Sequence, residues 1–249
     1  MARIAVISDI HGNLEALEAV LLAIQKSKVD HLVHLGDLVG YNANPRECVE
    51  LLREHQAICV LGNHDMALLE PRFAENFNVM AFQALHYSIS QLTPLEKRYL
   101  QGLARSEVLW DRYLICHGTP ESLESYIQNV FQAKRTFNLL RKHYSGVRVC
   151  FFGHTHVQTA WISDPRGKVF ALEHSNGELH LESDHRYLVN PGSVGQPRQR
   201  DNRAHYLLFD SEREVVAFRA VPYDIKTAQD KILKAKLPQY LALRLNDGI

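Results

Sequence analysis

Five short motifs of this chain combine carboxylate, amide and imidazole side chains, and each follows an apolar run typical of a β-strand. The motifs are SDIHGN, LGDLVG, LGNHD, CHG and GHTH. Their side chains are the ligands that hard and borderline divalent metals prefer, and no cysteine is needed among them. The candidate metal ligands are Asp9, His11, Asp37, Asn63, His117, His154 and His156, and His64 stands beside them.

Most of these motifs are weak when taken singly. An Asp after a strand is often a helix cap, and a Gly-Asp pair is often a turn. Asn63 is less ordinary, because a neutral amide at a strand end needs a ligand or a turn to occupy its oxygen. His154 and His156 are the most specific pair, since two imidazoles two positions apart can converge on one point. Ligands collect at the carboxyl ends of strands in open α/β sheets, so the whole set predicts one shared metal site.

Alternating strands and helices are expected to position these motifs, up to about residue 157. The predicted strands are 4–7, 31–35, 58–61, 108–110, 113–116 and 147–152. The predicted helices start after Asn13 and near Pro45, cover 79–92 and, after a Thr93 cap, 95–103, and include 130–140. This alternation indicates an α/β fold.

After His156 the apolar period shifts toward two. Short strands are predicted at 159–162, 169–172, 178–181, 187–189, 205–209 and 215–221, separated by turn signals such as DPRG and SNG. A last helix is expected over about 225–236. Because no repeat or linker interrupts the pattern, we expect a single domain over 1–249, with a βα-type part to about 157 and a strand-rich part over about 158–222.

Charge and cysteine content limit the binding partners and the cellular compartment that we expect for this chain. Lys+Arg and Asp+Glu both number 28 in the 249 residues, so no overall field favours long nucleic acid or an anionic membrane. The four cysteines show no CxxC spacing, and we expect them to be reduced apolar residues. The apolar stretch that ends at Asp9 is too short for a signal peptide, which predicts a cytoplasmic protein. The oligomeric state stays open.

The motif order DxH, GD, GNH, H and GHxH resembles that of the calcineurin-like metallophosphoesterase superfamily, over residues 9 to 156. The resemblance implies a four-layer α/β/β/α sandwich with the site at one edge of the inner sheets. It also implies that Asp37 bridges two metals and that His64 is a catalytic residue that binds neither. One metal would be held by Asp9, His11 and His156, and the other by Asn63, His117 and His154.

The implied chemistry agrees with the ligand types. Two divalent ions about 3.5–4 Å apart can activate water and hold a phosphate ester for in-line attack. A bridging ligand must carry charge toward both ions, which suits the carboxylate of Asp37. Neutral Asn63 and the imidazoles keep the total ligand charge low. Manganese, iron and zinc all tolerate such mixed sites, and we expect two such ions, with manganese as the first choice.

Residues 36–42 read GDLVGYN, and two of the departures from the GDxVDRG motif of the protein serine/threonine phosphatases affect the chemistry. Gly40 replaces the carboxylate that partners the catalytic histidine there, and Tyr41 replaces a phosphate-binding arginine. The chain is therefore more similar to the small bacterial and archaeal phosphodiesterase branch. Some relatives of that branch are grouped with diadenosine tetraphosphatases. Tyr41 either stacks on a base or lines a turn.

The loop over residues 190–198, NPGSVGQPR, is similar to the NPGS segment of the same branch. Its N–H groups either cradle a phosphate or form a plain turn between strands. Arg198 is either a solvated loop residue or a phosphate clamp. The candidate substrate-binding residues are therefore Tyr41, Ser193 and Arg198.

Three functions compete. The leading hypothesis is a two-metal phosphodiesterase or phosphatase for a small phosphoester, nucleotides included. The alternative is a non-catalytic, metal-binding interaction scaffold on the same fold, like the retromer scaffold subunit. His64 and the complete ligand set argue against it. A nuclease for long nucleic acid is disfavoured by the zero net charge and the lack of a basic stripe with interleaved aromatic residues.

Overall fold

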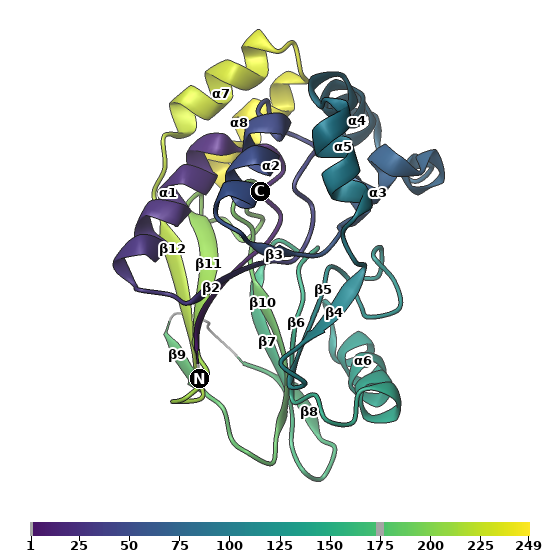
Figure 1. Ribbon diagram of the computed structural model, residues 1–249, viewed down its shortest axis with the longest axis vertical. Helices are drawn as coiled ribbons and strands as arrows, with labels where there is room; N and C mark the ends of the chain where they lie inside the picture. The colour runs from purple at the N-terminus through teal and green to yellow at the C-terminus, as the bar shows by residue number, and fades with distance from the viewer. Residues whose placement is uncertain (1, 173–176) are drawn as a thin grey trace.

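Two six-stranded β-sheets pack face to face in the computed structural model, which describes residues 2–172 and 177–249 (Figure 1). The first sheet has the order β3-β2-β1-β11-β12-β9, with β1 Arg3–Ile7, β2 His31–His34, β3 Ile58–Cys59, β9 Glu178–His180, β11 Ala204–Asp210 and β12 Val215–Val221. The second has the order β4-β5-β6-β10-β7-β8, with β4 Ser106–Leu109, β5 Tyr113–Cys116, β6 Val149–Phe151, β7 Gln158–Ser163, β8 Val169–Ala171 and β10 Arg186–Pro191.

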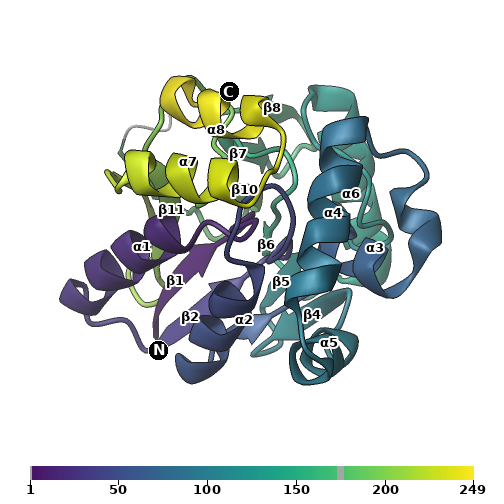
Figure 2. The same ribbon diagram turned by 90° about the horizontal axis from the view of Figure 1, so that it is seen from above.

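Helices cover the outer face of each sheet. Their bounds are α1 Leu14–Lys26, α2 Pro45–Glu54, α3 Asn63–Leu69, the 3₁₀ helix η1 Pro71–Ala74, α4 Val79–Gln91, α5 Pro94–Gln101, α6 Val130–His143, α7 Ile225–Lys234 and α8 Gln239–Asp247. Helix α1 packs on β11 and β12 and against α2 and α7, while α6 packs on β7, β8 and β10. Seen from above, α7, α8, α1 and α2 lie on one side and α6 on the other (Figure 2).

Side-chain alternation along the strands produces the layers. Ile4 and Val6 of β1 belong to the apolar cluster between the two sheets. Ala5 and Ile7 point the other way, into the cluster under α1 and α2. Cys150 of β6 belongs to a third cluster, between the second sheet and α6. The predicted four-layer α/β/β/α sandwich is therefore confirmed.

The parallel strands bring their carboxyl ends together. In the first sheet β2 runs parallel to both β1 and β3, and in the second β6 runs parallel to both β5 and β10. Strands β11 and β7 run antiparallel beside these groups. The loops that follow β1, β2 and β3 thus gather at one edge of the first sheet, and those after β5, β6 and β10 gather likewise on the second.

Local sequence signals explain several helix starts. The Asn13 side chain accepts a hydrogen bond from the Ala16 N–H at 3.2 Å, which confirms the predicted cap of α1. Thr93 and Glu96 form a capping box at α5, and Pro45 opens α2. The starts of α1 and α2 fix where the chain turns after β1 and β2, and the capping box fixes the turn between α4 and α5.

Some elements differ from the sequence prediction. The pattern indicates no helix at α3 or η1, because each is too short to show a helical apolar period. Helix α8 was also not predicted, although its nine residues bury Leu241, Ala242 and Leu245. The last predicted helix ends as α7 at Lys234, and α8 follows Pro238. Ser175 and Asn176 of the predicted SNG turn lie outside the described residues.

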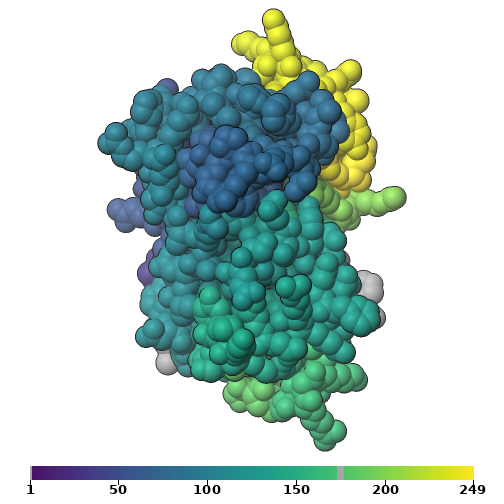
Figure 3. Space-filling view, turned by 90° about the vertical axis from the view of Figure 1, so that its right-hand side faces the viewer, coloured from purple at the N-terminus to yellow at the C-terminus, as the bar shows by residue number. Residues whose placement is uncertain are grey.

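Helices α3 and η1 and helix α6 share one face of the molecule (Figure 3). Within the described ranges, no helix has the length and apolar character needed to cross a bilayer.

Candidate metal centre

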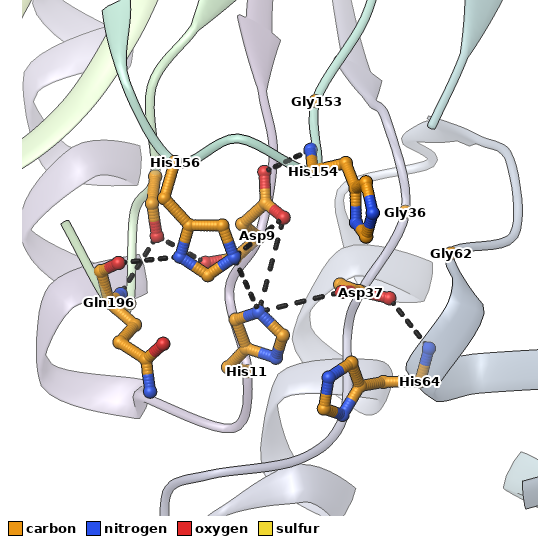
Figure 4. A network of polar contacts seen from close by, with 12 residues as sticks. Asp9, His11, Gly36, Asp37, Gly62, His64, Gly153, His154, His156 and Gln196 are labelled. Atoms are coloured by element: carbon orange, nitrogen blue, oxygen red, sulfur yellow. Dashed lines mark hydrogen bonds and ion pairs between the residues drawn. The ribbon is translucent and has the colours of Figure 1, made fainter. Parts of the chain in front are cut away.

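The predicted ligands lie at the carboxyl ends of the parallel strands, on both sheets. They are all buried, and Figure 4 shows several of them around a common centre. Asp9 and His11 follow β1, and Asp37 follows β2. Asn63 is the first residue of α3 after β3, His117 follows β5, and His154 and His156 follow β6. The structure therefore brings all seven predicted metal ligands together.

Asp9, His11 and His156 form the first group. Both imidazoles donate from Nδ1 to a backbone carbonyl: His11 to the carbonyl of Val39 at 3.0 Å, and His156 to the carbonyl of Gln196 at 2.6 Å. Because a carbonyl only accepts, each Nδ1 carries the hydrogen and each Nε2 is bare. The two Nε2 atoms are 3.2 Å apart, and His156 Nε2 is 3.2 Å from Asp9 Oδ1. Three electron-pair donors thus face one another.

His117, Asn63 and His154 form the second group. His117 Nδ1 donates to the Leu35 carbonyl at 2.9 Å, which leaves Nε2 bare in the neutral ring. His154 is turned the other way, because its Nε2 donates to the Glu124 carbonyl at 3.2 Å. Its bare Nδ1 lies 3.1 Å from His117 Nε2, which is also 3.0 Å from Asn63 Oδ1.

Asp37 connects the two groups. Its Oδ1 accepts a hydrogen bond from the His64 backbone N–H at 2.9 Å. Its Oδ2 lies 3.5 Å from His11 Nε2 and 3.3 Å from His117 Nε2. One carboxylate oxygen is therefore shared between both sets of bare nitrogens, as a bridging ligand requires.

The arrangement fits two divalent cations. Candidate ligand atoms of Asp9, His11, Asp37 and His156 lie within 4.8 Å of one another, and so do those of Asp37, His117 and His154. Asp9 Oδ1 is buried and receives no hydrogen bond from the described residues. Converging bare acceptors repel one another unless a cation lies between them.

The electrostatics agree with this interpretation. Burial lowers the pKa of His154 to about 3, so this imidazole is neutral and available as a ligand. At His117 burial also acts to lower the pKa, but the Asp37 carboxylate outweighs it and the pKa rises to about 9. Without a metal ion the His117 Nε2 therefore holds a proton beside Asp37, and it would be a bare ligand nitrogen only when a metal ion takes the place of that proton.

Five of the seven ligands have left-handed backbone conformations. Their φ angles are 55° at Asp9, 51° at His11, 60° at Asp37, 66° at His154 and 59° at His156. Such conformations are strained for residues other than glycine and persist only where the surroundings hold them. Backbone hydrogen bonds between the loops do so here, because Asp9 N–H donates to the Gly36 carbonyl at 3.0 Å and His11 N–H to that of Asp37 at 2.9 Å.

Asp65 supports the site, and the sequence prediction missed it. Its two carboxylate oxygens accept hydrogen bonds from the backbone N–H groups of Asp37 at 2.8 Å, Leu38 at 2.9 Å, Val39 at 3.1 Å and Gly62 at 3.0 Å. It thereby ties the loop after β2 to the start of α3. The sequence feature that could have indicated this role is the acidic residue at the third position of a helix, where a capping box has an acidic side chain.

A cavity of about 340 Å³ opens onto the candidate metal centre. Tyr41 and Arg198 both line it, together with Asp37, His64 and His156. The Tyr41 ring lies 4.6 Å from the His11 ring, between centroids. Two of the three predicted substrate-binding residues therefore reach the cavity.

The structure does not bring Ser193 to this cavity. Ser193 is fully buried, and its Oγ donates to the Asp9 carbonyl and accepts from the Gln196 N–H, both at 2.8 Å. The loop's N–H groups point the same way, since those of Val194 and Gly195 bind the carbonyls of Ser8 and Asp9 at 3.0 Å. These contacts argue against a phosphate cradle at Ser193, Val194 and Gly195 and favour the turn between strands, which here supports the Asp9 backbone.

His64 is held by aromatic packing. Its ring centroid lies 4.7 Å from that of Tyr41 and 4.4 Å from that of Phe77. Its buried Nδ1 has no hydrogen-bond partner among the described residues, and a Cβ on Gly40 would lie 2.6 Å from it. Gly40 also has φ of +97°, so no carboxylate is easily accommodated at this position. Burial lowers the pKa of His64 to about 4.

Comparison with known proteins agrees with this geometry. The sequence model of the calcineurin-like phosphoesterase family matches residues 2–158. The chain belongs to this family. A metallophosphoesterase from Sphaerobacter thermophilus has a similar crystal structure, with 37% identity, a TM-score of 0.86, and coverage of 99% of this chain and 100% of that one.

Two curated relatives indicate to which branch of the calcineurin-like phosphoesterases the chain is similar. An uncharacterised protein of Methanocaldococcus jannaschii is 35% identical over 252 residues, covering 97% of this chain and 96% of that protein. The phosphodiesterase YfcE of Escherichia coli is 27% identical over 225 residues, covering 85% and 89%. These similarities support phosphoesterase chemistry within the small bacterial and archaeal phosphodiesterase branch.

Proposed function

We propose that this protein is a two-metal phosphoesterase that hydrolyses small phosphodiesters or phosphomonoesters. The observation that carries the proposal is the convergence of bare acceptor atoms in two groups that share one oxygen of Asp37. The proposed ligands are Asp9, His11 and His156 for one cation, Asn63, His117 and His154 for the other, and Asp37 for both. Manganese is our first choice, ahead of iron and zinc.

When bound, the two cations polarise the phosphoester and activate the attacking water. The chain supplies the remaining positioning. Arg198 is the one Lys or Arg side chain among the described residues that line the cavity, and its Nη2 is held by Gln196 Oε1 at 3.0 Å. Its guanidinium binds a phosphate oxygen, a role that the phosphatase motif gives to the residue at Tyr41.

Access for the substrate is through the same cavity. Its volume of about 340 Å³ suits a small phosphoester. Long nucleic acid and membranes are not expected partners, and a cytoplasmic location stays a prediction.

His64 is the proposed catalytic residue. It lines the cavity, and of its two ring nitrogens Nδ1 is the enclosed one, so Nε2 is the nitrogen that reaches a substrate. A proton or hydrogen bond donated there to the leaving oxygen matters most when the departing alkoxide is basic.

The substitution His64→Asn tests this role. It should leave both metals in place, slow an alkyl or ribose ester by about 10²–10⁴-fold, and slow a p-nitrophenyl ester much less. Metal content and kcat/KM for both ester types are the measurements. Equal slowing of both esters would mean that His64 only binds the phosphate.

The replacement of arginine by Tyr41 favours diesters. A phosphate dianion needs more positive charge than a diester monoanion, and besides the two proposed cations Arg198 is the one Lys or Arg side chain among the described residues that line the cavity. An aryl phosphodiester should therefore be hydrolysed at least as well as the matching monoester. A strong monoesterase preference with several different metals would contradict this expectation.

A substrate panel on metal-stripped protein refilled with manganese tests the function as a whole. The panel contains phosphomonoesters, a bis-aryl diester, cyclic nucleotides and dinucleoside polyphosphates. Turnover that depends on the added metal supports the proposal. Absence of turnover with manganese, iron and zinc would favour the alternative, a non-catalytic interaction scaffold that binds metal.

A further inference from the structure

Tyr126 forms a wall of the cavity that no metal ligand or substrate residue named above accounts for. It lies in the segment between β5 and α6, and it lines the cavity together with Phe77 and His154. Its ring stacks on that of His154, with centroids 4.0 Å apart and planes 23° apart. Tyr126 nevertheless remains 39% exposed. Since one face rests on His154, the uncovered part of the ring is available to the cavity.

The lining of this cavity is largely aromatic and amide in character. Phe77 is a second ring, Asn76 and Asn78 supply carboxamides, and Glu124, close to Tyr126 in the chain, supplies an acidic side chain. Cationic charge is confined to Arg198, whose backbone N–H donates to the His156 carbonyl at 3.3 Å. A phosphate beside Arg198 would therefore place its organic substituent along a surface that stacks rings and pairs with uncharged polar edges.

We infer that Tyr126 is a specificity-determining residue, which stacks on a planar, uncharged ring carried by the substrate phosphate. An aryl group and a nucleobase share this chemistry. The inference rests on the proposed function for the choice of a phosphate ligand, but the ring contact itself is a binding property.

A purely structural role for Tyr126 makes a different prediction. The backbone carbonyl of Glu124 already orients His154, and the Tyr126 ring covers that imidazole. If Tyr126 only protected His154, its loss would weaken metal binding and every phosphate ligand equally. A contact with the substrate ring instead changes the ratio between ligands that differ only in that ring.

Phosphonates provide the test, because their P–C bond resists hydrolysis. Dissociation constants for methyl-, cyclohexyl- and phenylphosphonate are measured by calorimetry on manganese-loaded protein, with metal content determined for each sample. Phenyl and cyclohexyl groups are similar in size, so their ratio reports stacking more than apolar area. Thymidine 5′-phosphonate, as a fourth ligand, tests whether a nucleobase reaches the ring.

The wild-type protein should bind phenylphosphonate about 2–10-fold more tightly than cyclohexylphosphonate. Tyr126→Phe should keep this ratio, because the ring remains, and Tyr126→Leu should bring it near one. Phe131→Leu is the matched control, since Phe131 is 78% exposed and does not line the cavity. It should change neither the ratio nor the affinities.

Two results would overturn the inference. One is a wild-type ratio near one, and the other is an unchanged ratio in Tyr126→Leu, including the case where all ligands weaken together with the manganese content. These results are separable from failure of the proposed function. Protein that binds phosphonates with the Tyr126-dependent ratio but hydrolyses no ester would refute only the catalytic proposal. Protein that hydrolyses esters without the ratio would refute only this one.

Discussion

Replacing Gly195 by alanine should disrupt the support of the first metal group. A Cβ at this position would lie 1.8 Å from the Ile10 carbonyl oxygen and 2.9 Å from Asn13 Cβ. Contacts below 3.0 Å do not occur at real Cβ atoms, so the two loops must separate by about 1 Å. Asp9 and His11 flank Ile10, and the separation would therefore move two ligands.

The size of the effect follows from the contacts that the separation breaks. The Gly195 N–H donates to the Asp9 carbonyl, the Val194 N–H donates to that of Ser8, and the Gly195 carbonyl accepts from Asn13 Nδ2, each at 3.0 Å. Loss of these three hydrogen bonds, together with overpacking, should lower the free energy of unfolding by roughly 3–7 kcal/mol. This is a large part of the stability of an ordinary domain, about 5–15 kcal/mol.

Urea unfolding followed by circular dichroism, with metal content measured on the same samples, is the assay. Gly177→Ala is the matched control, because a Cβ there meets nothing within 4 Å, and its effect should be below about 1 kcal/mol. Equal unfolding midpoints for the two variants, with both metals retained, would refute the reasoning. Unchanged stability with weaker phosphate binding would instead assign the loop to the substrate.

Three further predictions follow from buried groups. Asp65→Asn should lower the free energy of unfolding in urea titrations by about 2–6 kcal/mol, because the new NH₂ group cannot accept two of the four backbone hydrogen bonds. Asp111→Asn, at an exposed turn, is the control and should change this free energy little. Burial lowers the pKa of His34 to about 3, whereas its pKa in the unfolded chain is about 6.5. As the pH falls below 6.5, His34 is therefore protonated in the unfolded chain but not in the folded one, and the free energy of unfolding decreases. His34→Gln should therefore reduce the loss of unfolding free energy between pH 7 and pH 5 by about 2 kcal/mol, and an unchanged pH slope would contradict this. Asp37→Ala should lower kcat/KM with manganese more than His11→Ala or Asn63→Ala, since it removes charge from both cation positions; equal losses would argue against a bridge.

Much of the candidate metal centre could be predicted from the sequence because each candidate ligand lies shortly after an apolar strand. Strand ends are local features, and parallel strands place their carboxyl ends together. The order of Asp9, Asp37 and His117 along the chain therefore already indicated one site. The alternation of strands and helices indicated the α/β fold, whereas the four-layer sandwich, in which Ile4 and Ala5 face different layers, was implied by the family resemblance.

Residues whose roles depend on distant contacts could not be predicted in this way. Tyr126 and Phe77 lie in loops whose distance from the metal centre is set by the packing of the two sheets. Ser193 lies in a Gly/Pro-rich loop, and such a loop has the same sequence pattern whether its N–H groups face a phosphate or the Asp9 backbone. Helix α3 has only seven residues, too few for a helical period to show.

The central claim is that two cations share the Asp37 carboxylate, and metal stoichiometry tests it most directly. Metal-stripped protein is refilled with manganese, freed of excess metal by gel filtration, and assayed by elemental analysis together with Asp37→Ala. We predict two manganese ions per wild-type chain and a loss from both positions in the variant. A wild-type chain that binds one ion or none, or a variant that keeps two, would contradict the account.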